Sequence, residues 1–339
     1  MLSNITVSPS PHISKHMSTR SIMVDVIIAL VPAMIAAVWY FRIHALLLVA
    51  TCVLTAVLTE YLCNLARQKP NPCESIGDFS AVITGLILAM SVPPQLPLWA
   101  AVIGSAFAIA IGKMVFGGLG ANIFNPAMVG RAFLTASFGM MMTTWTVPAG
   151  IDPAMPKISA ENKVDAYTQQ TPLAWSKQAI KDKTGADVVN NQLSAMFTGK
   201  TGGCLGETST LALIIGGIYL LIRRTISFHI PLAVLLAAFV FASIAYLINS
   251  SAYASPLVHL TGGGMLICAF FIATDPVTAP LTTRGMWIFG IGVGAITMLI
   301  RIVGEYPEGI MYSILLMNAV TPLIDRFCKL VPAGGKPHV

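Results

Sequence analysis

Long uncharged, apolar stretches dominate this chain, and short polar segments separate them. Most stretches have close to the roughly 20 residues that a helix needs to cross a bilayer. Backbone groups in hydrocarbon must find partners within their own segment, so each stretch is predicted to be a helix. The predicted helices are Ile22–Phe41, Ala45–Ala66, Gly77–Val92, Pro97–Val115, Asn125–Met142, Leu205–Ile222, Ile230–Ile248, Pro256–Thr274, Gly285–Val303 and Gly309–Leu330.

Two of these predicted helices carry a break. The third, Gly77–Val92, is short and runs into Pro93 and Pro94, and the eighth is followed directly by Asp275 and Pro276. Helices interrupted inside a membrane expose polar backbone, which is tolerated where it lines a cavity rather than lipid. The two breaks therefore predict a polar cavity within the membrane part.

One long hydrophilic segment, residues 143–204, divides the predicted helices into five and five. Because five is odd, the second set must enter the membrane in the opposite orientation. The spacing of Pro93 and Pro97 recurs at Pro276 and Pro280, which supports a repeat of this kind. The predicted fold class is an all-α membrane protein with about ten transmembrane helices in two inverted five-helix halves with broken helices, plus one long extracytoplasmic loop. The expected units are a cytoplasmic N-terminal segment 1–21, a first membrane half 22–142, the loop 143–204, a second membrane half 205–330 and a cytoplasmic tail 331–339.

Basic residues in short loops predict the orientation, because lysine and arginine are in excess on the cytoplasmic side. With the N-terminus inside, only Arg42 and Arg301 fall in outer loops, apart from six lysines of the long loop, which the rule does not count. We therefore expect both termini inside and residues 143–204 outside, with Cys204 accessible from outside and Cys73 from inside. The twelve basic residues assigned to the inner side are Lys15, Arg20, Arg67, Lys69, Lys113, Arg131, Arg223, Arg224, Arg284, Arg326, Lys329 and Lys336.

The composition supports the membrane interpretation and excludes other classes. Only 10% of the 339 residues are charged, whereas a soluble domain carries about 25%, so a soluble enzyme, a secreted disulfide scaffold and a disordered regulator are ruled out. The net charge is +6, but no run of basic residues is longer than Arg223-Arg224, which argues against a nucleic-acid partner. The six cysteines and six histidines show no metal-ligand spacing, and no metal site is predicted.

A glycine-rich segment, Gly117–Met128, is the first candidate for chemistry. Its sequence is GGLGANIFNPAM. Glycine-rich backbone brings amide groups close to an anion or a flat ring, which makes Asn122 and Asn125 candidate ligands. The alternative is a tight loop in which Asn125 caps a helix that has Pro126 in its first turn.

Ionisable residues near the predicted breaks are the second candidates. Asp275 lies at a break, where a carboxylate either binds something or caps a helix end at the interface, and we weigh the two equally. Glu60 and Lys113 lie deepest and would suit a proton or cation path, although anchoring at the interface is favoured for both. The same interfacial interpretation is favoured for Asp25, Arg131, Arg301 and Asp325.

The outer segment Asp165–Leu173, with the sequence DAYTQQTPL, has the composition of an ordinary surface segment. Pro172 favours an extended Thr171. Nothing in the composition of this segment by itself indicates a cofactor.

Three motifs nevertheless resemble those of one family: GGLGxNxFNPAM at 117–128, DxxTxxTPL at 165–173 and TDPVTA at 274–279. The pattern resembles the D subunit of the Rnf electron-transport complex, which is related to the B subunit of the sodium-pumping NADH:quinone reductase. The resemblance covers nearly the whole chain. It implies a multi-pass protein of the bacterial inner membrane.

The resemblance also implies cofactors. In the family, the last threonine of the outer motif carries FMN through a phosphoester bond that a flavin transferase forms outside the cell. That position is Thr171, and Asp165, Thr168, Pro172 and Leu173 complete the attachment motif. Gln170 departs from the alanine that is usual in the family. A second, non-covalent flavin such as riboflavin is a further candidate, with Asn122, Asn125 and Asp275 as candidate residues for a membrane flavin or ion site.

The function expected from the resemblance is a flavin-carrying integral membrane subunit of a redox-driven ion pump. Such a subunit passes electrons between ferredoxin-linked and NAD-linked partners, coupled to Na⁺ or H⁺ translocation, and is not catalytically complete alone. The chain has no dinucleotide fingerprint and no iron–sulfur ligand pattern, so iron–sulfur and FMN subunits of the complex must supply those cofactors. The alternative functions are a passive small-solute permease or channel on the same inverted-repeat fold, or a structural scaffold.

Overall fold

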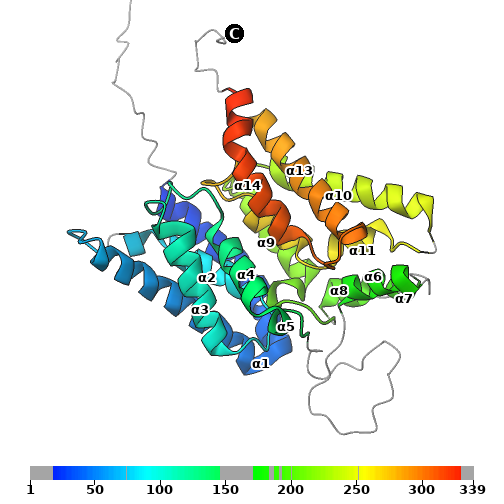
Figure 1. Cartoon of the computed structure of the whole chain (residues 1–339), viewed down its shortest axis with the longest axis horizontal. Coiled ribbons are helices and arrows are strands. Elements are labelled where there is room, and N and C mark those ends of the chain that lie inside the picture. Colours follow the sequence, from blue (N-terminus) through cyan, green and yellow to red (C-terminus); the bar gives the residue numbers. More distant parts are fainter. Residues whose placement is uncertain are drawn as a thin grey trace, which may run out of the picture.

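The protein is described by a computed structural model, which covers residues 18–73, 75–145, 171–182, 187–190, 193–199, 201–250 and 252–329. Its described residues form helices and turns, with no strand among them (Figure 1). An all-α fold is therefore confirmed for this part of the chain. The division into five units, the count of ten crossings and the inverted halves stay predictions.

The first helix, α1 (Thr19–Ala66), covers the first two predicted stretches. It consists of two helical arms that meet at Arg42, whose φ of 57° and ψ of −140° are not helical. The blue ribbon of α1 changes direction between these two arms (Figure 1). The predicted boundary between the two stretches, residues 42–44, contains the kink.

The remaining predicted stretches are also helical in the structure. The first set contains η1 (Ser75–Asp78), α2 (Ser80–Met90), α3 (Leu98–Ile109), the π-turn η2 (Ala110–Met114), α4 (Pro126–Ser137) and α5 (Gly139–Met142). The hydrophilic segment contributes α6 (Pro172–Asp182), α7 (Asp187–Asn190) and α8 (Leu193–Thr198). The second set contains η3 (Leu205–Glu207), α9 (Thr210–Ile222), α10 (His229–Ile248), α11 (Pro256–Thr261), α12 (Met265–Ile267), the π-turn η4 (Cys268–Ile272), α13 (Thr283–Ile302) and α14 (Ile310–Phe327).

Among the described residues, α1, α10, α13 and α14 are long and apolar enough to cross a membrane. Shorter apolar helices cover Ser80–Met90, Leu98–Met114 and Thr210–Ile222. The two predicted breaks are present as well: α2 ends at Met90, and η4 ends at Ile272, shortly before Asp275 and Pro276. The stretch Pro256–Thr274 has one further break that was not predicted, between α11 and α12.

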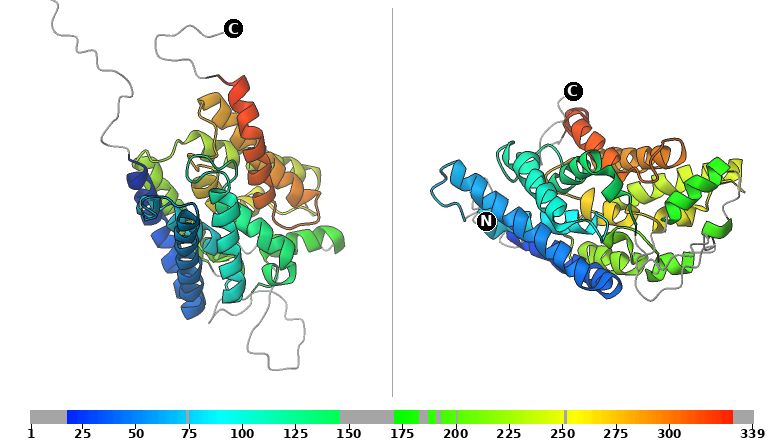
Figure 2. Two further views of the ribbon diagram at one scale, coloured as in Figure 1. Left: turned by 60° about the vertical axis from the view of Figure 1, so that its left-hand side comes forward. Right: turned by 60° about the horizontal axis from the view of Figure 1, so that its bottom comes forward.

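Helix packing brings distant segments together around a buried interior. Helices α1 to α4 pack mainly on one another, as do α10, α13 and α14, while α9 packs on α1 and α14 packs on α4. Gly216 of α9 lies so close to the carbonyl oxygen of Ala29 in α1 that any Cβ there would clash. Small residues allow such close approach between apolar helices. The two further views in Figure 2 show the same arrangement.

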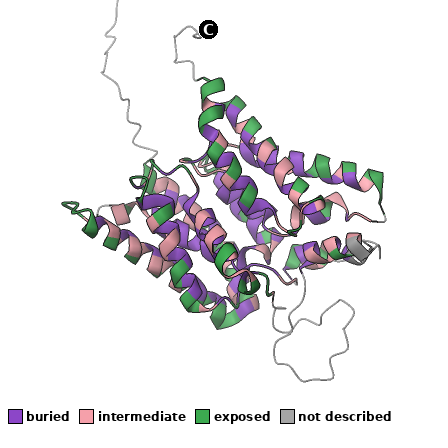
Figure 3. Cartoon of the chain, viewed as in Figure 1, coloured by how far each residue is buried: buried purple, intermediate pink, exposed green. Residues whose placement is uncertain are grey.

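The outward faces of the long helices are apolar. Leu54, Trp39 and Leu247, for example, are 69%, 69% and 83% exposed. Exposed residues occupy one side of these helices and buried residues the other (Figure 3). An exposed apolar surface of this extent is typical of contact with lipid.

Candidate functional site

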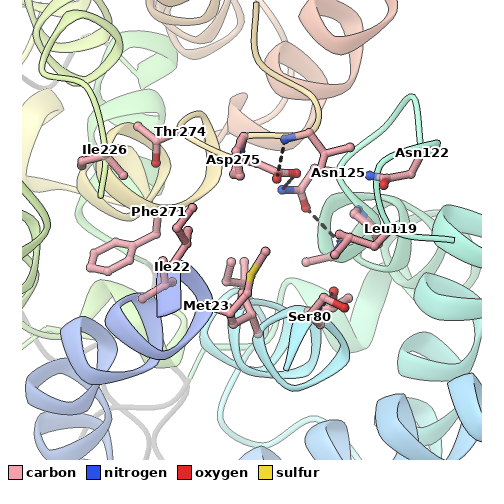
Figure 4. Close-up of a pocket in the computed structure, with 18 of the residues that line it drawn as sticks. Ile22, Met23, Ser80, Leu119, Asn122, Asn125, Ile226, Phe271, Thr274 and Asp275 are labelled. Carbon is pink, nitrogen blue, oxygen red and sulfur yellow. Dashed lines mark hydrogen bonds between the residues drawn. The ribbon is translucent and has the colours of Figure 1, made fainter. Parts of the chain in front are cut away.

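A cavity lies among α1, α2, η2, the segment 119–127 and the turn that follows η4. The empty space between its lining atoms is about 720 Å³, which includes space open to the outside. Ile22, Met23 and Phe271 give it apolar walls, and Ser80, Asn122, Asn125 and Asp275 add polar groups to its lining (Figure 4). Small-molecule sites combine apolar walls with a few placed polar groups in this way.

The cavity unites two of the sequence motifs. The Nδ2 of Asn125 is 3.4 Å from Oδ2 of Asp275, and the two side chains point toward one another (Figure 4). Asn125 also caps α4, because its Oδ1 accepts from the backbone N–H groups of Ala127 and Met128, so the capping interpretation of Asn125 is confirmed. Asp275 accepts bonds from the N–H of Val277 and the hydroxyl of Thr278, so it both caps a turn and lines the cavity.

Asn122 supplies a polar atom without a partner. Its Nδ2 donates to the carbonyl of Phe124, but its buried Oδ1 accepts no hydrogen bond. The chain reaches this position through Gly117, Gly118 and Gly120, which all have positive φ angles. Only glycine adopts such angles without cost, and this explains the glycine-rich sequence. A buried oxygen without a partner beside a cavity suits a ligand that donates a hydrogen bond.

Lys113 and Glu60 form a buried ion pair at the same cavity. Nζ of Lys113 lies 2.8 Å from each carboxylate oxygen of Glu60 and 2.6 Å from Oγ of Ser80. Lys113 and Glu60 are each 1% exposed. The expectation that both residues anchor at the interface is therefore wrong. The apolar sequence around Glu60 and around Lys113 does not indicate that these two residues, 53 positions apart, neutralise one another.

Both cavity motifs follow a π-turn. Lys113 belongs to η2, directly before the glycine-rich segment, and η4 ends two residues before Thr274 and three before Asp275. A π-turn widens the helix by one residue and often marks a functional position. No hydropathy pattern distinguishes such a turn from an ordinary helix, so the sequence did not show it.

Thr171, Pro172 and Leu173 lie at a separate place, where α6 begins. Oγ1 of Thr171 accepts from the N–H of Ala174, and the residue is 7% exposed. A Cβ on Gly263 would come within 2.6 Å of Cδ1 of Leu173, so the segment 171–173 packs directly on the turn between α11 and α12. The interpretation of this segment as ordinary surface is wrong for these three residues. Asp165, Thr168 and Gln170 lie outside the described residues.

A charged cluster beside this segment was missed from the sequence. The two carboxylate oxygens of Glu308 accept from Arg131 at 3.3 Å and Arg301 at 3.2 Å, and Oε1 also accepts from the N–H of Gly264. Arg131 and Arg301, 8% and 3% exposed, therefore lie at the same end of the molecule, and their assignment to opposite membrane sides is wrong. Interfacial anchoring is also wrong for both, since each guanidinium is buried against a carboxylate.

Glu207 of η3 and Glu308 of this cluster have pKa values that are shifted in opposite directions. Burial and the charge of Glu308 raise the pKa of Glu207 to about 8. Burial raises the pKa of Glu308, but Arg131 and Arg301 outweigh it and hold that pKa at about 2. Cys204, which donates its thiol to the carbonyl of Ser91, is fully buried, so the expectation that it is accessible from outside is wrong.

Comparisons with known proteins agree with the motifs. A model of the NQR2, RnfD, RnfE family matches residues 6–334. The chain is 46% identical to the D subunit of the Na(+)-translocating ferredoxin:NAD(+) oxidoreductase complex of Acetobacterium woodii, over 96% of this chain and 94% of that protein. It is 44% identical to the D subunit of the proton-translocating ferredoxin:NAD(+) oxidoreductase complex of Clostridium ljungdahlii, over 98% and 96%. It is 38% identical to the D subunit of the ion-translocating oxidoreductase complex of Yersinia enterocolitica, over 95% and 96%.

Proposed function

The chain belongs to the NQR2, RnfD, RnfE family, and we propose that it is the flavin-carrying membrane subunit of an Rnf-type ion pump. It is a subunit of a redox-driven, ion-translocating oxidoreductase complex, as its relatives are. In the proposal it passes electrons between ferredoxin-linked and NAD-linked partner subunits while the complex moves Na⁺ or H⁺. The names of the relatives favour this function over a passive permease.

The first proposed flavin is FMN, which a flavin transferase attaches to Thr171 through a phosphoester bond. The hydroxyl lies at the N-terminus of the 11-residue helix α6, where it accepts from a backbone N–H. A phosphate group there meets the positive end of the helix dipole. Thr171 and its surroundings therefore suit a phosphoester, and the packing of Leu173 would hold the attached group near the charged cluster.

The second proposed flavin occupies the cavity lined by Asn122, Asn125 and Asp275. The observation that carries this proposal is the unpaired, buried Oδ1 of Asn122 beside a cavity with apolar walls. The polar edge of an isoalloxazine ring has N–H donors for such an oxygen, and Asn125 and Asp275 would orient the same edge. A bound flavin would supply one- and two-electron transfer, and the protein would position it and exclude water.

We expect Asn122→Leu to remove the non-covalent flavin from the cavity. The substitution takes away the unpaired oxygen and fills space, whereas Thr171 and its attachment segment are untouched. The measurement is the amount of flavin that the purified complex releases on denaturation. The fluorescence of the flavin that stays covalently bound to the chain is measured in the same sample. Asn318→Leu in α14 is a matched control, because that amide is 1% exposed, also lacks a partner and does not line the cavity. Equal flavin release from both variants and the wild type would refute the cavity proposal.

We also propose that the charge of Asp275 takes part in ion movement. Asp275→Asn keeps an oxygen for the N–H of Val277 but removes the negative charge, so ion transport by the complex is expected to fall severalfold while covalent flavin stays in place. The measurement is Na⁺ or H⁺ uptake by vesicles that contain the assembled complex. Unchanged uptake would leave Asp275 with a capping role alone.

We propose further that the cavity end of the protein faces the cytoplasm and that the Thr171 end faces outside. Arg223 lies 3.3 Å from Asp25, and Thr225 and Ile226 line the cavity, so the basic turn after α9 is at the cavity end. With Arg131 moved to the outer side beside Arg301, eleven basic residues on the inner side still support this orientation against three. The cytoplasmic side is then also the side of Cys73.

Thiol labelling tests this orientation. In intact cells, a membrane-impermeant thiol reagent is expected to label a Glu305→Cys variant, since Glu305 is exposed in the loop between α13 and α14. The native Cys73 is exposed as well and should react only after the cells are opened. The same reagent applied to a Cys73→Ser/Glu305→Cys protein identifies the labelled position. Labelling of Cys73 alone in intact cells would reverse the orientation.

A further inference from the structure

A chain of hydrogen bonds runs from η1 to the wall of the cavity. Ser80, the first residue of α2, donates its hydroxyl to Oδ1 of Asp78. Lys113 in turn donates to Oγ of Ser80 at 2.6 Å. A serine hydroxyl both donates and accepts, so the three groups form a continuous path along which protons can be exchanged.

The two ends of this path differ in their surroundings. Ser80 and Lys113, 6% and 1% exposed, both line the cavity. Asp78 is only half-buried and lies beside the exposed Gly77 and close in sequence to the exposed Cys73. The path therefore joins solvent at the Cys73 side of the molecule to the interior of the cavity.

Glu60 forms the ion pair with Lys113 at the inner end of the path. Both carboxylate oxygens of Glu60 are 2.8 Å from Nζ, so a buried ammonium is compensated and its remaining N–H is directed at Ser80. The third N–H of a buried ammonium needs an acceptor in any case, and here that acceptor is Ser80. The feature that the pair alone does not explain is the further link from Ser80 to Asp78, a half-buried carboxylate.

We propose that Asp78, Ser80 and Lys113 form a proton relay that serves the cofactor bound in the cavity. This inference rests on the proposed second flavin. It adds that proton transfer to this flavin occurs from the Cys73 side, through residues that belong to neither of the two cavity motifs.

The relay balances charge during reduction. Each electron that a partner subunit delivers adds one negative charge in the cavity. For each such electron, Lys113 would turn the N–H that it directs at Ser80 toward the cavity and release that proton to the bound cofactor. The hydroxyl of Ser80, which donates to Asp78 in the structure, would then turn, give its proton to Nζ and receive one from Asp78, which a hydronium ion from solvent has protonated. One electron and one proton enter together, and reoxidation reverses both steps.

The test is Ser80→Ala in the complete complex, which interrupts the path but leaves the pair of Lys113 and Glu60 in place. Proton uptake is followed with a pH-indicator dye in a stopped-flow mixer while the non-covalent flavin is reduced. We expect the rate of uptake to fall about tenfold or more, in line with the loss of one proton-transfer group. Ser80→Thr, which restores a hydroxyl, should recover the rate, and Asp78→Asn should slow it because an amide does not supply the proton.

Ser105→Ala is the matched control. Ser105 is fully buried in α3, and its hydroxyl has no partner. If Ser80→Ala retains its flavin and takes up protons at the wild-type rate, or if Ser105→Ala is slowed equally, the relay is overturned. If the wild-type complex releases no non-covalent flavin on denaturation, the proposed second flavin itself fails, and this outcome is distinct because it is measured before any variant is compared.

Discussion

Thr171→Ala is expected to abolish the fluorescent band that covalent flavin gives on a denaturing gel under ultraviolet light. The substitution removes the oxygen that would form the phosphoester, so no partial labelling should remain. The protein should still insert, because losing the helix cap costs only about 0.5–2 kcal/mol. That cost follows from the bond between Oγ1 of Thr171 and the N–H of Ala174, so a small decrease in thermal stability should accompany the loss of flavin.

Three variants control this experiment. Thr171→Ser keeps both the acceptor oxygen and the helix cap, and should keep the band. Thr168→Ala should weaken labelling without abolishing it, since in the proposal this residue contributes only to recognition by the transferase. Gln170→Ala restores the usual residue of the family and should label at least as well as the parent. A persistent band in Thr171→Ala would show that the flavin is attached elsewhere.

Lys113→Met is expected to have the largest effect on stability. It leaves the carboxylate of Glu60 buried without a partner, and breaking a buried pair from one side costs about 3–5 kcal/mol. The measurement is thermal unfolding of the detergent-solubilised protein. Lys113→Met combined with Glu60→Leu should recover much of the loss, because two apolar side chains replace the pair without leaving a buried charge.

A half-exposed ion pair provides the comparison. Arg223 lies 3.3 Å from Asp25, but its side chain is 53% exposed, so Arg223→Met should change stability by no more than about 1 kcal/mol. If Lys113→Met is as mild as Arg223→Met, then water reaches Glu60 and the pair is not sealed in the protein. The proton relay would then have a second entrance, and its dependence on Ser80 should weaken in parallel.

The ion that moves is not decided by overall similarity. One relative at 46% identity is named for Na⁺ translocation and another at 44% for proton translocation. Overall identity therefore does not assign the ion to this chain. Vesicle transport measurements on the wild type and on Asp275→Asn, with Na⁺ and with a pH gradient monitored in parallel, would identify the ion and test one of its candidate residues.

Local sequence determined the helical content and several details of this protein. The apolar stretches correspond to helices because unpaired backbone in an apolar environment is costly wherever it occurs, whatever the neighbours. The cap at Asn125 is also a local feature, because it needs only the next three residues. The breaks near Pro93 and Pro276 depend on local sequence in the same way. The motif that contains Thr171 could be found in the sequence. Its proposed role in flavin attachment came from the resemblance to a family and not from the composition of the segment.

Only the tertiary structure decided which polar groups meet. Asn125 contacts Asp275 across 150 positions, Lys113 neutralises Glu60 across 53, and Glu308 binds Arg131 across 177. A charge near the end of an apolar stretch is compatible with the interface and with a buried partner alike, because hydropathy measures the cost of burial and not its compensation. The partner is set by how helices pack, and packing depends on side-chain shapes along whole faces rather than on any local pattern. For that reason the sequence placed Arg131 and Arg301 on opposite sides of a membrane, whereas the fold brings both guanidinium groups to one carboxylate.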